Sequence, residues 1–129
     1  MDAAHVAAAD SAVRYWISQY DASVPTLELP TDRPRPALRS FASSRLDVPI
    51  EPALLDGVRK LGARNGTSLF ASLFSVFSAL IARLGGADDV VIGVPAAGQS
   101  AEGLDTLVGH CVSLLPIRVA VDLEQDVAT

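Results

Sequence analysis

The chain has 129 residues, half of them hydrophobic, and a formal net charge of −5 at pH 7, which suits one domain with an apolar core. This acidic balance argues against nucleic acid as a partner, because phosphate binding needs a cationic face. A single cysteine excludes an internal disulfide, and the N-terminus has no basic segment typical of a secretory signal, so we expect a cytoplasmic protein.

The first predicted element is a helix over residues 3–20, where an alanine run favours helical structure and larger apolar residues recur at helical spacing. It is followed by residues 29–36, with the sequence Leu-Pro-Thr-Asp-Arg-Pro-Arg-Pro. Three prolines remove backbone donors and fix φ, so this segment can be neither helix nor central strand. We expect a stiff, extended strap that spans two bodies of the protein.

A short strand is predicted over Phe41–Val48, because apolar and charged residues alternate loosely there. A helix is predicted to begin near Glu51-Pro52 and to stop at Asn65-Gly66, since proline suits a first helical turn and glycine a helix end. Its buried stripe is expected to contain Leu54, Leu55, Val58 and Leu61.

Another helix is predicted to be capped by Thr67 or Ser68 and to end at Gly85-Gly86. It is apolar almost all round, which indicates a central helix that packs closely against its neighbours. Its apolar stretch, Leu69–Leu84, is shorter than the roughly 20 residues that a bilayer requires. We therefore expect a core helix and no membrane span.

Two strands complete the predicted order. The continuous apolar run Val90–Val94 indicates a strand buried on both faces, and Val112–Asp122 alternates clearly. Residues 95–107, rich in glycine and alanine, are expected to form a loop.

The sequence contains no phosphate-binding G-x-x-x-x-G-K-[ST], no G-x-S-x-G and no H-E-x-x-H motif. The neighbours Asp88 and Asp89 do not suggest a metal site, since adjacent strand residues point to opposite faces; we expect a solvated strand entry. The same geometry argues against His110 and Cys111 as a catalytic pair.

Four segments occur in one order along the chain. They are Tyr15-Trp16 with the strap that follows; the helix from Gly66-Thr67-Ser68-Leu69-Phe70 to Ala82-Arg83-Leu84-Gly85-Gly86; residues 88–98; and residues 108–118. The third resembles a G-x-P-x-A-G-R loop and the fourth a V-G-x-F-V-N-T-L-x-L-R strand. Together they resemble the condensation domains of nonribosomal peptide synthetases, and the cysteine and proline of the fourth segment resemble the subset found in hybrid polyketide–peptide synthetases.

The resemblance implies an α/β (α+β) fold like that of chloramphenicol acetyltransferase. In that fold, helices pack on a mixed sheet and two lobes meet in a V with a tunnel between them. The chain would then be a partial condensation domain: a helix leading to the lobe crossover (1–25), a proline-rich strap (26–40) and the start of the second lobe (41–129). The parent would form amide bonds between aminoacyl or acyl thioesters held on carrier proteins by phosphopantetheine. It would use no cofactor and no metal of its own.

The family's H-H-x-x-x-D-G motif, whose second histidine positions or deprotonates the amine, does not occur in this sequence, and neither does its H-Q-D-x-P-F segment. No residue here is therefore assigned as catalytic, and the chain alone is expected to be inactive. By resemblance, Gln99, His110 and Ser113 line or support the tunnel. The residues assigned to the lobe crossover are Pro30, Asp32, Arg33, Pro34, Arg35 and Pro36.

Two of these positions depart from the family pattern. Gln99 replaces an arginine that pairs with the aspartate of the histidine motif, and a neutral amide cannot supply that charge-assisted, bidentate contact. Ser113 replaces an asparagine at the tunnel wall and is shorter, with a different donor pattern.

The implied partners are the remainder of the condensation domain, peptidyl or acyl carrier proteins and adjacent synthetase domains, with no nucleic acid and no membrane. Two alternatives remain open at this point. One is a non-catalytic interaction module of a synthetase assembly line, and the other is a related acyltransferase that uses an alcohol acceptor.

Overall fold

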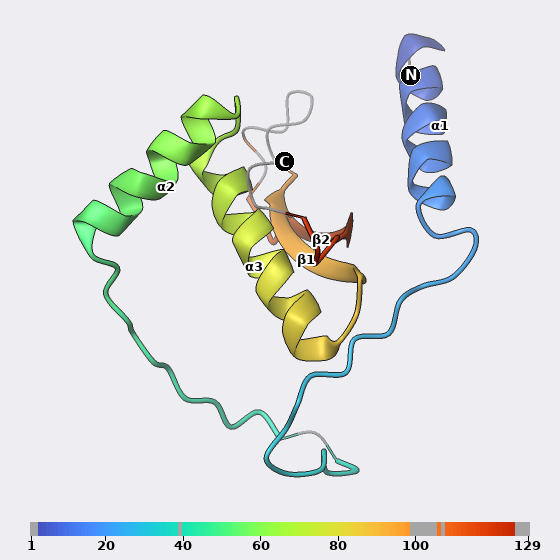
Figure 1. The fold of residues 1–129 in the computed structure, drawn as a ribbon. Coiled ribbons are helices and arrows are strands. Elements are labelled where there is room, and N and C mark those ends of the chain that lie inside the picture. Colours follow the sequence, from blue (N-terminus) through green and yellow to red (C-terminus); the bar gives the residue numbers. More distant parts are fainter. Residues whose placement is uncertain (1–2, 39, 99–105, 107, 126–129) are drawn as a thin grey trace. The chain divides into compact units, whose positions relative to one another are not determined.

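The computed structural model describes residues 3–38, 40–98, 106 and 108–125. Its elements are α1 (Ala3–Ser18), α2 (Pro52–Arg64), α3 (Leu69–Gly85), β1 (Asp89–Ala97) and β2 (Val112–Ala120) (Figure 1). They fall into two compact units: the first comprises residues 1–27 and 89–120, and the second residues 28–88 and 121–129. Helices together with an antiparallel strand pair confirm the predicted α/β class.

In the second unit, the residues at the helix ends explain where α2 and α3 begin and end. Pro52 lies in the first turn of α2, where its missing N–H costs nothing, and Asn65 caps the other end. The hydroxyl of Ser68 accepts a hydrogen bond from the N–H of Ala71 at 3.1 Å and so caps α3. Gly86 ends α3 with φ 62°, a left-handed conformation that glycine adopts readily. These caps confirm the predicted helix bounds.

Close approach at Gly62 allows α2 to pack against α3. The two helices are bent by 103° at their junction, and a Cβ atom at Gly62 would lie only 2.4 Å from Ser72 Oγ. The expected apolar stripe of α2 is only partly covered, because the side chains of Leu54 and Leu61 are 63% and 38% exposed.

The exposure of α3 also departs from prediction. Phe70 and Leu80 are 63% and 51% exposed, whereas Ser78 and Ala82 on the small-residue face are buried. The apolar residues of α3 surround its axis, so burial of its small-residue face leaves several of them exposed. Among the described residues, no single helix is long and apolar enough to cross a membrane, and α2 with α3 meets that test only as a bent pair, by length and composition.

Residues 28–50 form neither helix nor strand wherever the structure describes them, as predicted for the proline-rich residues 29–36. That these residues span two bodies of the protein stays a prediction. The strand predicted over Phe41–Val48 is wrong. Loose alternation produces a strand only where a neighbouring strand accepts its hydrogen bonds, and β1 and β2 pair with each other. Within this segment Arg45 and Asp47 form an exposed ion pair at 2.7 Å.

In the first unit, β1 and β2 pair in antiparallel register, from Asp89 opposite Ala120 to Ala97 opposite Val112. β2 confirms the predicted strand, and β1 runs three residues beyond the predicted end at Val94. Val90 is buried, while its neighbours Val91 and Ile92 are half-buried.

The hydrogen-bond pattern explains how both strands tolerate a proline. Just beyond β1, the N–H of Gly98 donates to the carbonyl of Cys111 at 2.7 Å. In an antiparallel pair such bonds link every second residue, so Pro95 and Pro116 both have backbone groups that point away from the partner strand. Neither proline therefore removes a hydrogen bond between the strands, and the predicted loop begins after the strand has passed Pro95.

Candidate functional site

The strand pair carries the sequence-predicted tunnel residues that the structure describes. Ser113 lies on β2 opposite Ala96 and is exposed, on the same face of the pair as buried Val90. His110 precedes β2 and is exposed as well. Gln99 lies outside the described residues, so its expected role stays a prediction. The structure thus places Ser113 and His110 near one end of β2 and leaves their contribution to a tunnel untested.

His110 and Cys111 differ in their surroundings, as expected for adjacent residues at a strand entry. His110 is exposed, whereas Cys111 is half-buried and its carbonyl oxygen accepts the N–H of Gly98. No hydrogen bond joins the imidazole to the thiol among those found in the described residues, so the geometry gives no support to a nucleophile–base pair.

The residues assigned to the crossover are all exposed. They are Pro30, Asp32, Arg33, Pro34, Arg35 and Pro36. An exposed segment that carries prolines and arginines can present charged groups to a partner, and its assignment as a lobe crossover stays a prediction.

At the opposite end of the strand pair lies an ion pair that sequence reasoning missed. Arg118 Nε lies 3.1 and 3.0 Å from the two carboxylate oxygens of Asp89, and Nη2 also donates to Asp89 Oδ2. The Arg118 and Asp89 side chains are 23% and 30% exposed. Asp88 is exposed, as expected for a solvated strand entry, whereas Asp89 is half-buried and paired. The strand register explains the pair: Arg118 lies opposite Val91, so its side chain lies diagonally beside that of Asp89 on the same face of the strand pair.

This ion pair shifts the proton equilibria of both groups. The hydrogen bond from Arg118 lowers the pKa of the Asp89 carboxyl, an effect that outweighs the opposing desolvation. The same hydrogen bond raises the pKa of the Arg118 guanidinium. Both groups are therefore charged near neutral pH. The described residues contain no cluster of histidine, cysteine and acidic side chains that could hold a metal ion.

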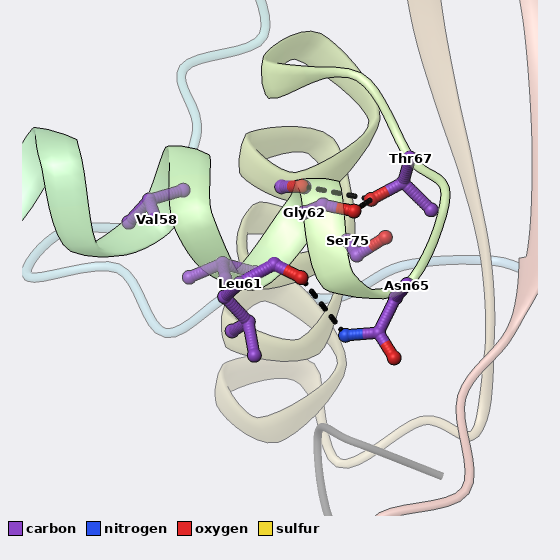
Figure 2. A pocket seen from close by; sticks show the side chains of 8 residues that line it. Val58, Leu61, Gly62, Asn65, Thr67 and Ser75 are labelled. Atoms are coloured by element: carbon purple, nitrogen blue, oxygen red, sulfur yellow. Dashed lines mark hydrogen bonds between the residues drawn. The ribbon is translucent and has the colours of Figure 1, made fainter.

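The second unit contains a small pocket beside the α2–α3 junction. Figure 2 shows its lining, and its volume is about 140 Å³. The amide of Asn65 donates to the carbonyl of Leu61, and the hydroxyl of Thr67 donates to the carbonyl of Gly62 (Figure 2). The hydroxyls of Ser72 and Ser75 donate to carbonyls one turn earlier in the chain. The polar side chains of the lining thus already have partners, and none of the lining residues is titratable. Ligand pockets are usually larger than about 300 Å³. This pocket is a packing gap and not a reaction site.

Comparison with known proteins identifies the family. The family described as "Condensation domain" matches residues 3–129. A plipastatin synthase of Bacillus subtilis (strain 168) is 36% identical over 104 residues, which are 81% of this chain and 3% of that protein. Tyrocidine synthase 2 of Brevibacillus parabrevis is also 36% identical over 104 residues, 81% of this chain and 3% of its own length.

A further relative, a linear gramicidin synthase of Brevibacillus parabrevis, is 36% identical over 109 residues, 84% of this chain and 2% of its own length. The chain therefore spans only a few per cent of the curated relatives that it matches. The matched range includes all four segments that carried the resemblance. The chain belongs to the condensation-domain family of peptide synthetases and is a fragment of such a domain.

Proposed function

We propose that the domain to which this chain belongs forms amide bonds between acyl groups carried as thioesters. The observation that carries this proposal is the condensation-domain match over residues 3–129. The relatives are named as synthases of plipastatin, tyrocidine and gramicidin. The partners we propose are the rest of the domain, carrier proteins that bring both substrates, and adjacent synthetase domains.

The proposed reaction is attack of an amine on a thioester carbonyl. The amine nitrogen forms a bond to the carbonyl carbon, the carbon–sulfur bond breaks, and the carrier thiol leaves with the proton that the nitrogen loses. A general base whose pKa lies near neutral pH must accept that proton during the attack. We assign this base to no residue of the chain, in agreement with the absence of paired histidines from its sequence.

The chain's proposed contribution is structural support of the tunnel. Ser113 is exposed at one end of β2, where its hydroxyl can donate and accept hydrogen bonds to a bound substrate arm. A regular strand holds such a side chain more firmly than a loop does. Gln99 would supply a neutral hydrogen-bond partner where the family pattern has an arginine.

The test is a condensation assay on the whole synthetase that contains this sequence, with donor and acceptor carriers loaded with radiolabelled acyl groups. We expect an amide product on the acceptor carrier, and we expect Ser113→Ala to slow its formation by a modest factor while Ser113→Asn retains it. Loaded carriers that yield no amide, or an ester formed from an alcohol acceptor, would contradict the proposal.

A further inference from the structure

The donors of Arg118 are divided between two partners. Nε and Nη2 lie on one side of the guanidinium and hold the Asp89 carboxylate. The remaining nitrogen, Nη1, donates to the backbone carbonyl of Gln19 at 2.6 Å. These partners stand 29 and 99 residues away in the sequence, so one side chain links β1, β2 and the segment that follows α1.

The segment after α1 has a second bond to the strand pair. The phenol of Tyr20 donates to the carbonyl of Pro116. That carbonyl belongs to the set that points away from β1, so Tyr20 lies at the outer edge of β2. Two consecutive residues, Gln19 and Tyr20, are therefore tied to β2, one through its carbonyl and one through its side chain.

Arg118 supplies positive charge at the C-terminal end of α1. The last turn of α1 contains no basic residue, although carbonyl groups at a helix C-terminus carry partial negative charge. The Arg118 guanidinium of β2 provides that positive charge by donating to the Gln19 carbonyl. Asp89 orients that cation, because a side-on fork fixes the guanidinium plane and leaves Nη1 directed at Gln19.

We propose that Arg118 is a positioning residue that fixes the end of α1 to the β1–β2 pair, with Asp89 holding the guanidinium in the required orientation. The chain leaves this anchor toward the strap, so the anchor gives the connecting segment a fixed origin on the strand that also bears Ser113. This inference deepens the proposed function and rests on it only for the catalytic consequence; the anchor itself is testable without any activity.

The experiment measures amide hydrogen exchange by mass spectrometry in the whole condensation domain of the synthetase. The readout is residues 15–20, where the N–H groups of Gln19 and Tyr20 donate to the carbonyls of Tyr15 and Ile17. For Arg118→Met we expect exchange there to accelerate by about tenfold or more, since charge-assisted hydrogen bonds are lost. The matched control is Arg45→Met, which breaks an exposed ion pair and should change nothing at residues 15–20.

A charge swap separates anchoring from simple pairing of the strands. In the double variant Asp89→Arg, Arg118→Asp, the opposite charges are retained, but an aspartate at 118 cannot donate to the Gln19 carbonyl. We expect exchange within β1 and β2 to recover and exchange at residues 15–20 to stay fast. Arg118→Lys keeps a donor without the fork and should give an intermediate rate.

Restored protection of residues 15–20 in the swap, or unchanged protection in Arg118→Met, would overturn the proposal. If Arg118→Met unfolds the domain, Tyr20→Phe replaces it as the test. This substitution removes only the hydrogen bond to Pro116 and should speed exchange at residues 15–20 severalfold. An unchanged exchange rate would contradict the anchor. Amide formation is assayed in parallel on the wild type. A protected anchor in a synthetase that forms no amide would reject the proposed function and leave the anchor intact.

Discussion

The hydrogen bonds inside the second unit and those inside the first differ in the sequence separation that they span. At the α2–α3 junction, side-chain hydrogen bonds join residues three to five apart, such as Ser68 to Ala71 and Thr67 to Gly62. In the first unit, the bonds from Arg118 to Gln19 and from Tyr20 to Pro116 span 99 and 96 residues. The helical junction is thus a local structure, and the α1 anchor depends on distant parts of the sequence.

This difference has consequences for folding and for sensitivity to mutation. Local contacts can form early, because they close short loops at low entropic cost. The anchor can form only after β1 and β2 have found their register and α1 has docked. Substitutions at the α2–α3 junction should therefore act within the second unit, and substitutions at the anchor within the first.

Gly62→Val should have the largest effect. A Cβ atom there would meet Ser72 Oγ at 2.4 Å and the backbone oxygen of Thr67 at 3.2 Å. We expect overpacking to destabilise α2 and α3 by roughly 2 kcal/mol. The measurement is the free energy of local opening of residues 52–85 by native-state hydrogen exchange in the condensation domain.

The control for this substitution lies in the same helix. A Cβ atom at Gly57 would meet nothing within 4 Å beyond its chain neighbours and the backbone of its own helix, so Gly57→Ala should stabilise α2 by about 0.5–1 kcal/mol. If Gly62→Val also speeds exchange within β1 and β2 to the same extent, the separation between a local junction and a long-range anchor is wrong.

Gly86→Ala should have the next largest effect. Gly86 ends α3 at φ 62°, where an L-residue with a Cβ atom is strained. We expect a loss of about 1–2 kcal/mol in the opening free energy of α3. Asparagine tolerates this conformation better, so Gly86→Asn should cost clearly less. Equal losses for alanine and asparagine would show that backbone conformation is not the cause.

The helix ends could be predicted from the sequence because each depends only on residues close together in the chain. Pro52, Asn65, Ser68 and Gly86 mark helix ends through bonds and dihedral angles within one turn, and the structure confirms each of them. The strand predicted over Phe41–Val48 was wrong, because a strand depends on a partner elsewhere in the chain.

The long-range features could not be predicted in the same way. Asp89 was expected to be solvated, since its partner Arg118 becomes its neighbour only through the strand register. The link to Gln19 uses a backbone carbonyl, which no side-chain pattern reveals. Of the candidate site, the sequence pointed to Ser113 and His110 but not to the anchor at the other end of β2.

Ser68→Ala should have a smaller effect that stays near the start of α3. It removes the hydroxyl that accepts the Ala71 N–H at 3.1 Å, and loss of such a cap costs about 1 kcal/mol. Ser68→Asp keeps an acceptor and should retain most of the stability. Exchange at the first turn of α3 measures both variants. An equal loss in the two would mean that the cap does not stabilise α3.

Acidification should have the smallest effect on stability near neutral pH, and it should act on the first unit, which contains Asp89 and Arg118. The pKa of Asp89 is lower in the folded protein than in the unfolded chain, so the ion pair contributes stability above the unfolded value of about 3.9 and loses it as pH falls through the folded pKa. Arg118 stays charged throughout, since its pKa is raised. We therefore expect exchange at residues 15–20, corrected for its intrinsic pH dependence, to be constant from neutral pH to about pH 5 and to accelerate below about pH 4. Asp89→Asn should remove this acid sensitivity and leave that of the α2–α3 junction unchanged. An identical acid response in the wild type and Asp89→Asn would show that Asp89 does not orient Arg118 toward Gln19.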